Sequence, residues 1–232
     1  MKQTTKQIAL VLSIATLAAT STSASAIDLR VIGAVTPSAC TPVLGGGGTI
    51  DYGSIPPSSL SPTDYTVLPV MSTAMNITCD APAKVAVVAK NGRVGTLAGS
   101  TEGATGVGFS PVNLLGFTNM AAAGLGLDGN SKIGGYSVAF QASTMLADGV
   151  PVTTIQKTSL GGEFSASVAG AIYGTNTNRY LSWAATGSLD PVAFTTLTGQ
   201  LQVQAYLNKS TELDLSKPVN LDGLTTLELV YL

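Results

Sequence analysis

The 232-residue sequence has no histidine and only two cysteines, Cys40 and Cys79. The commonest general base and metal ligand of proteins is therefore missing. If the cysteines form a disulfide, no thiolate is left to bind zinc. Paired carboxylates hydrolyse glycosides without histidine, but Glu212, Asp214 and Asp222 fall in a polar stretch typical of solvated surface. We therefore expect no enzyme activity, no metal site and no cofactor, and a hydrolase based on carboxylates is the weaker alternative.

Charge is also scarce. Charged residues make up 10% of the chain and hydrophobic residues 45%, a balance opposite to that of disordered proteins. Eleven basic residues face 13 acidic ones. A chain of this composition has no electrostatic basis for binding nucleic acid, so no nucleic-acid partner is expected.

The N-terminus carries a pattern typical of export. Lys2 and Lys6 precede a mostly apolar run at residues 8–19, and Ala24-Ser25-Ala26 fits a small-residue cleavage site. The run is too short for a transmembrane helix, which needs about 20 residues. The pattern predicts a signal peptide over residues 1–26 and one domain over residues 27–232.

An even number of cysteines in an exported chain favours one disulfide, Cys40–Cys79. A closed loop of roughly 40 residues would stabilise the fold by about 4 kcal/mol in the chain-entropy treatment. The alternative is two free thiols.

Apolar residues alternate with other residues along most of the chain, which predicts strands. The N-terminal example comprises Ile27, Leu29, Val31, Gly33 and Val35. Further strands are expected at residues 49–52, 75–78, 84–90, 136–140 and 201–205, with a tight turn at Asn91-Gly92. No segment has a sustained helical period with capping residues. The pattern predicts an all-β protein, an antiparallel β-sandwich.

Twelve of the 26 glycines lie within residues 92–135, which predicts long loops and bulged strands there. Residues 124–129 (GLGLDG) match the dinucleotide-binding pattern G-x-G-x-x-G. That motif needs a helix after it, whereas Asn130, Ser131 and Lys132 lead into another expected strand. A β-turn at Asp128-Gly129-Asn130 is the better interpretation.

The two ends of the chain share features with a known family. Residues 31–40 (VIGAVTPSAC) resemble the first strand of chaperone–usher pilins, in which a second cysteine follows about 40 residues later. The C-terminus is similar to the pilin C-terminal strand with its penultimate tyrosine. More narrowly, residues 221–232 (LDGLTTLELVYL) and 125–138 (LGLDGNSKIGGYSV) look like a domain family of unknown function associated with β-clade fimbrial operons.

The resemblance implies an Ig-like, pilin-type sandwich that lacks its last strand and is completed by donor-strand complementation. A periplasmic chaperone, an outer-membrane usher and other fimbrial subunits would be its partners, with a host or surface receptor for an adhesive subunit. The protein would pass through the periplasm to a cell-surface fimbrium. Leu227, Leu229 and Tyr231 would face the core beside an open groove, and the carboxylate of Leu232 would anchor the chaperone.

One feature departs from the family pattern. With cleavage after Ala26, only residues 27–32 precede Gly33, which is short for a donor extension. Earlier cleavage, a position at the fibre tip, or a subunit that never polymerises would each explain it. A receptor site is expected in loops of residues 92–135 or near Trp183. The competing hypothesis is a self-contained periplasmic or secreted binding module with all its strands in one chain.

Overall fold

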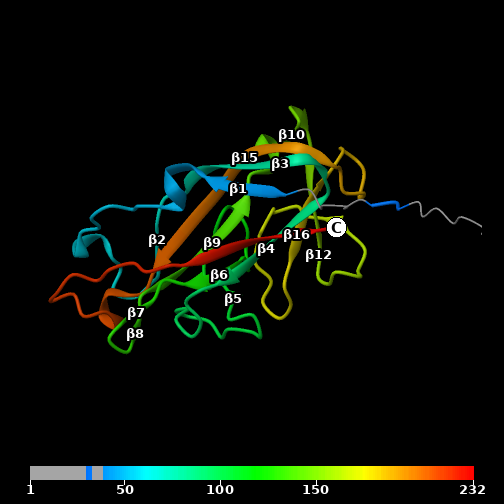
Figure 1. Cartoon of the computed structure of the whole chain (residues 1–232). Helices are drawn as coiled ribbons and strands as arrows, with labels where there is room; N and C mark the ends of the chain where they lie inside the picture. The colour runs from blue at the N-terminus through cyan, green and yellow to red at the C-terminus, as the bar shows by residue number, and fades with distance from the viewer. Residues whose placement is uncertain (1–29, 33–38) are drawn as a thin grey trace, which may run out of the picture. The chain divides into compact units, whose positions relative to one another are not determined.

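Strands account for nearly all of the regular structure in the computed structural model, which describes residues 30–32 and 39–232 (Figure 1). The expected signal peptide, and with it Ile27, Leu29, Gly33 and Val35, lies outside the described residues. Val31 belongs to no strand and is exposed.

The larger sheet, sheet A, is built around one long strand. Strand β15 pairs with β3 on one side and with β9 on the other, and every pairing is antiparallel. The order along the sheet is β1-β3-β15-β9-β6-β5, with β2 and β10 also paired to β15 and β11 paired to β10. The strands are β1 (Cys40–Leu44), β2 (Thr66–Val67), β3 (Met71–Ala83), β5 (Gly108–Phe109), β6 (Ala121–Gly124), β9 (Gly134–Phe140), β10 (Leu146–Ala147), β11 (Val150–Pro151) and β15 (Phe194–Leu207).

The smaller sheet, sheet B, has the order β13-β12-β14-β4-β16 and is also antiparallel. The chain passes from sheet A to sheet B at Lys84, between β3 and β4. The strands are β4 (Val85–Asn91), β12 (Thr153–Lys157), β13 (Ser165–Ala166), β14 (Tyr180–Ala184) and β16 (Thr225–Tyr231). Figure 1 shows β16, in red, running to the C-terminus.

The core lies between the two sheets. One apolar cluster contains Ile77, Leu197 and Phe140 from sheet A together with Val87 and Leu181 from sheet B, all of them buried. Side chains from both sheets therefore cover each other's apolar faces, as in a sandwich. The predicted antiparallel β-sandwich is confirmed.

The glycine-rich region supplies an additional layer. Leu97 and Leu114 pack with Tyr206 and Ala139 in a second, smaller apolar cluster. Residues 139 and 206 alternate with core-facing positions of β9 and β15, so this cluster covers the outer face of sheet A. The expected long loops in residues 92–135 are confirmed, with only short strands between them.

Several local predictions can be compared with the structure. The turn after Asp128 is confirmed, because β7 (Leu127–Asp128) and β8 (Ser131–Lys132) form a hairpin around Gly129 and Asn130. The strand predicted at residues 49–52 is wrong. That segment has no regular structure and follows a glycine turn in which Gly46 and Gly47 have positive φ. The remaining predicted strands, apart from the N-terminal one, coincide with parts of β3, β4, β9 and β15, and the one predicted at residues 84–90 is shifted by one residue from β4.

Helical structure is limited to single 3-10 turns in the described residues. These are η1 (Gly45–Gly48), η2 (Pro57–Ser59), η3 (Ala142–Thr144) and η4 (Ser210–Glu212). Across residues 30–32 and 39–232, no helix is long and apolar enough to cross a membrane.

Candidate functional site

The C-terminal strand β16 lies at the edge of sheet B. It pairs with β4 along its whole length, from Thr225 opposite Asn91 to Tyr231 opposite Val85. No strand in the described part of the chain pairs with its other side. An edge strand of this kind presents unpaired backbone groups that another strand can bind.

Two backbone hydrogen bonds establish which residues of β16 point outward. Gly92 N–H donates to the Leu224 carbonyl at 2.9 Å, and Leu232 N–H donates to the Lys84 carbonyl at 3.0 Å. Backbone groups alternate in direction along a strand, so the even-numbered residues bond β4. The N–H and C=O groups of Thr225, Leu227, Leu229 and Tyr231 therefore face away from β4. The side chains of Leu227 and Leu229 meanwhile pack on the core.

A pocket of about 1020 Å³ lies beside the first half of β16. Leu201 and Val203 of β15 and Val138 of β9 line it from sheet A, and Thr225 and Leu227 line it from sheet B. It therefore opens into the space between the sheets. We call this hollow the β16 pocket; its walls also include Leu44, Leu125, Ile133, Tyr136, Ile172, Ala205, Leu207, residues of the 48–60 loop and residues of the 213–224 loop.

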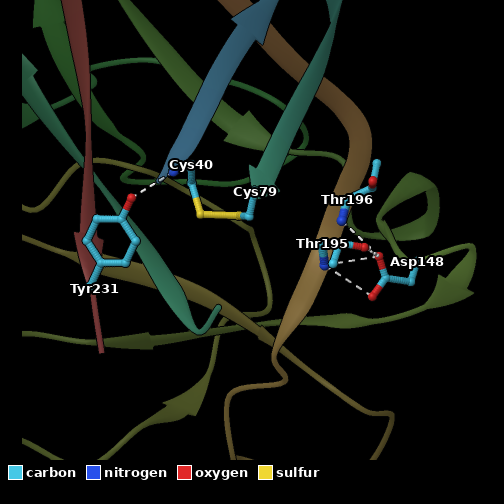
Figure 2. Close-up of a disulfide and its surroundings, with 6 residues drawn as sticks. All are labelled: Cys40, Cys79, Asp148, Thr195, Thr196 and Tyr231. Atoms are coloured by element: carbon cyan, nitrogen blue, oxygen red, sulfur yellow. Dashed lines mark hydrogen bonds between the residues drawn. A yellow bond between two sulfur atoms is a disulfide. The ribbon is translucent and has the colours of Figure 1, made fainter. Parts of the chain in front are cut away.

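The opposite end of β16 is closed by a bond to β1. Cys40 N–H donates to the phenol oxygen of Tyr231 at 2.8 Å (Figure 2). Cys40 is in turn bonded to Cys79 of the neighbouring strand β3, so the predicted disulfide is confirmed. Disulfides persist in oxidising compartments, which agrees with the expected export. The phenol thus spans the space between the edge of sheet A and the edge of sheet B.

Buried hydroxyl groups hold the start of β16. The Thr225 hydroxyl bonds the phenols of Tyr136, at 2.7 Å, and of Tyr173. Burial raises the pKa of Tyr136 above its ordinary value and raises that of Tyr173 well above it. Both phenols therefore remain protonated at neutral pH and available for hydrogen bonding.

The loop leading into β16 is held by an ion pair on the surface. Arg93 Nη2 lies 2.6 Å from Asp222 Oδ1, and Arg93 Nε donates to Asp222 Oδ2 at 2.8 Å. This hydrogen bonding lowers the pKa of Asp222 below its ordinary value. Gly223, which follows, lies so close to the Tyr136 ring that an added Cβ would meet a ring carbon at 2.8 Å. Both ends of β16 are therefore held, while the outward edge between them remains unpaired by the described residues.

Comparison with known proteins identifies relatives over nearly the whole length. The chain is 32% identical to the protein GltF of Escherichia coli K12, with 99% of this chain and 97% of GltF covered. The chain belongs to the family of GltF. Residues 29–137 match a family model described as a protein of unknown function, DUF1120. The chain is also 26% identical to the uncharacterized protein YhcF of the same organism, covering 89% of this chain and 90% of YhcF. No solved structure matches.

The C-terminal residues named from the sequence have different positions in the structure. Leu227 lines the β16 pocket, whereas Leu229 packs on the core beyond it. Tyr231 is 49% exposed and reaches Cys40. Leu232 is exposed, and among the described residues no ion pair involves its carboxylate.

Trp183 is fully buried on β14, with its ring centroid 5.3 Å from that of Phe140. It belongs to the core and is not itself accessible, and the expected receptor site near Trp183 stays a prediction. Two of the three acidic residues of the 212–222 stretch pair with cations, Asp222 with Arg93 and Asp214, at 3.8 Å, with Lys217. No group of side chains in the described part of the chain is arranged to hold a metal ion.

Sequence reasoning missed the other wall of the pocket. Tyr136 and Val138 were expected only as members of a strand, and Leu44 carried no signal. These residues are brought to β16 by pairings between strands far apart in the sequence, which local alternation does not encode. Tyr136 in the Gly134–Phe140 strand was the one available indication of a polar contact inside the sandwich, because buried Tyr hydroxyls need partners.

Proposed function

We propose that this protein is a structural or adhesive subunit of a chaperone–usher fimbria, exported and assembled by β-strand donation. The proposal rests chiefly on the unpaired edge of β16 beside an apolar pocket. A strand added there would bond the outward backbone groups of β16 and place alternate side chains between the sheets. The periplasmic chaperone, the usher and other fimbrial subunits are its proposed partners, and a receptor would be recognised by a tip or minor subunit.

The energetics support this proposal. Burying a large apolar side chain contributes about 1.5–3 kcal/mol. Two or three side chains of an incoming strand, placed in a pocket of about 1020 Å³, would therefore add roughly 3–9 kcal/mol before the costs of association. This is comparable with the whole stability of a typical domain, about 5–15 kcal/mol. The free subunit would be markedly less stable than the complemented one.

The assignment of the Leu232 carboxylate to the chaperone rests on the resemblance to pilins, in which this group is the chaperone's anchor. Leu232 is exposed, so a basic side chain of the chaperone would reach it there.

Thermal unfolding tests the proposal. The chain is produced with its leader in an oxidising compartment, purified, and heated with and without a nine-residue peptide that copies residues 27–35 (IDLRVIGAV). We expect the peptide to raise Tm in a concentration-dependent way, and a peptide of the same composition in scrambled order to have less effect. A monomer whose Tm is unchanged by the peptide and by a co-expressed chaperone would contradict the proposal.

The competing function is a self-contained binding module that uses the same pocket for a small apolar ligand. Its volume is at the upper end of the usual range for ligand pockets, about 300–1000 Å³. A small ligand would fill the pocket without bonding the edge of β16. Slower amide exchange at Leu227 and Leu229 on binding would therefore favour strand addition, and unchanged exchange would favour the module.

A further inference from the structure

The β16 pocket does not extend along the whole strand. Its lining includes Thr225 and Leu227 on β16 and Leu44 on β1, but neither Leu229 nor Tyr231. The part of the edge that lies beside the hollow is thus the first half of β16. Whatever enters the space between the sheets meets a wide end and a narrow end.

The narrow end is where Tyr231 bonds Cys40. The start of β1 meets the end of β16 there, while the last residue of β1, Leu44, lines the pocket, as Leu227 of β16 does. The two edge strands therefore run in opposite directions, with the hollow at one end and the Tyr231–Cys40 bond at the other. In Figure 2 the Tyr231 ring points from β16 toward the backbone of β1.

A strand inserted between two others lies about 4.8 Å from each, so the flanking strands must be roughly 10 Å apart with no side chain crossing between them. At Tyr231 the phenol itself crosses this space and accepts the hydrogen bond of Cys40 N–H. Cys40 N–H is an outward group of β1: Asp80 N–H bonds the Ala39 carbonyl, so odd-numbered β1 residues face β3. The phenol thus takes the hydrogen bond that an inserted strand would otherwise accept.

We infer that the Tyr231–Cys40 bond is a stop that ends the strand-accepting edge. This inference rests on the proposed function, and it defines where the partner's strand enters and where it ends. The incoming strand enters at the Leu44 end, bonds the outward groups of Thr225, Leu227 and Leu229, and ends before Tyr231. Five residues of pairing span about 17 Å.

The stop also determines the side chains that the partner needs. Beside Leu227 the incoming strand faces the hollow, so a large apolar residue fits there. Beside Leu229 the interior is already packed, so a small residue fits there. The partner is therefore a short strand whose largest apolar side chain enters opposite the first half of β16.

Residue-resolved amide hydrogen exchange of the whole chain, with and without the residue 27–35 peptide, tests the inference. We expect the peptide to slow hydrogen exchange of the Leu227 and Leu229 amides about two- to tenfold, because each would gain a hydrogen bond. Exchange at Tyr231 and Cys40 should stay unchanged. Slower exchange of the Tyr231 amide with faster exchange of the Cys40 amide would show that the added strand displaces the Tyr231–Cys40 bond. That result would contradict the stop but not strand addition. No change at any β16 amide would overturn both.

Two variants separate the bond from the ring. Tyr231→Phe keeps the ring and should speed exchange of the Cys40 amide about two- to tenfold in the free protein, with the peptide footprint unchanged. Tyr231→Ala removes the ring, so the peptide footprint should extend to the amide at position 231. A footprint that ends at Leu229 in Tyr231→Ala as well, or a Cys40 amide unaffected by Tyr231→Phe, would overturn the inference.

Discussion

The interior of this sandwich is packed at one end and hollow at the other, along the same strands. At the packed end, Phe194 of β15 and Phe140 of β9 surround Trp183, with ring centroids 6.1 and 5.3 Å away. At the other end, Ala205 and Leu207 of β15 and Tyr136 of β9 line the β16 pocket. Sheet A thus presents apolar side chains along both strands, and the two ends differ in what sheet B and its loops place opposite them.

On the proposed function, this difference reflects one missing neighbour, the donated strand. Sheet B supplies β14 opposite the packed end, and its edge strand β16 opposite the hollow. Among the described residues, no strand pairs with β16 on the side away from β4. Four substitutions test whether the two ends differ in packing, and the strongest effect is expected in the packed end.

Trp183→Ala should destabilise the fold most. It removes a fully buried side chain from the packed end and leaves a cavity that its aromatic neighbours cannot fill. We expect a loss of about 3–5 kcal/mol in the free energy of unfolding, measured by urea titration with circular dichroism. If Trp183→Ala lowered the free energy of unfolding no more than Leu227→Ala at the pocket does, the two ends would be equally poorly packed.

The double variant Cys40→Ser/Cys79→Ser should cost about 2–4 kcal/mol, because the closed loop between the cysteines, 39 apart in sequence, constrains the unfolded chain. It should also free the start of β1. The exchange rate of the amide at position 40 should therefore increase in the variant that also loses stability. An unchanged urea midpoint would show that the disulfide contributes nothing beyond the packing around it.

Leu227→Ala should cost about 1 kcal/mol, since the side chain is only half-buried and already borders a void. Thr226→Ala, an exposed neighbour on the opposite face, is the matched control. The variant should nevertheless weaken peptide binding more than the control does. A loss as large as that of Trp183→Ala would show that the pocket end is packed in solution.

Asp222→Asn should have the smallest effect, because the ion pair with Arg93 is largely exposed. The pKa of Asp222 is lowered in the folded state. Its stabilisation is therefore present above the unfolded pKa, about 3.9, and is lost as the pH falls through the lower folded value. Urea midpoints of the variant and the wild type should differ slightly at pH 7 and converge toward pH 3. The control is Asp190→Asn, because the Asp190 carboxylate bonds no described residue. If both variants shifted the urea midpoint equally at each pH, the Arg93–Asp222 pair would contribute nothing to stability.

Much of the fold could be predicted from local pattern. Alternation at residues 201–205 and 136–140 fell within β15 and β9, and the Asp128 turn formed the β7–β8 hairpin. The Asn91-Gly92 turn did not join hairpin partners. β4 pairs with β14 and β16 instead. The Asn91 side chain accepts a hydrogen bond from Arg93 N–H and leads the chain into the glycine-rich loops.

The β16 pocket could not be predicted in the same way. Its walls come from β1, β9, β15 and β16, whose proximity depends on pairings across most of the sequence. Alternation identifies which side chains point inward, but it does not say whether something lies opposite them. The hydrogen bond between Tyr231 and Cys40 joins residues 191 apart in the chain, and no local pattern encodes such a contact.

The order of β4 and β16 in the sequence has a consequence for folding. β4 is the first strand of sheet B along the chain, whereas its neighbour β16 is the last. Until β16 docks, β4 is itself an edge strand, and its apolar residues Val85 and Val87 lack their final neighbour. A folding intermediate without β16 therefore exposes an adhesive edge that the finished molecule no longer has, and it would need protection from aggregation.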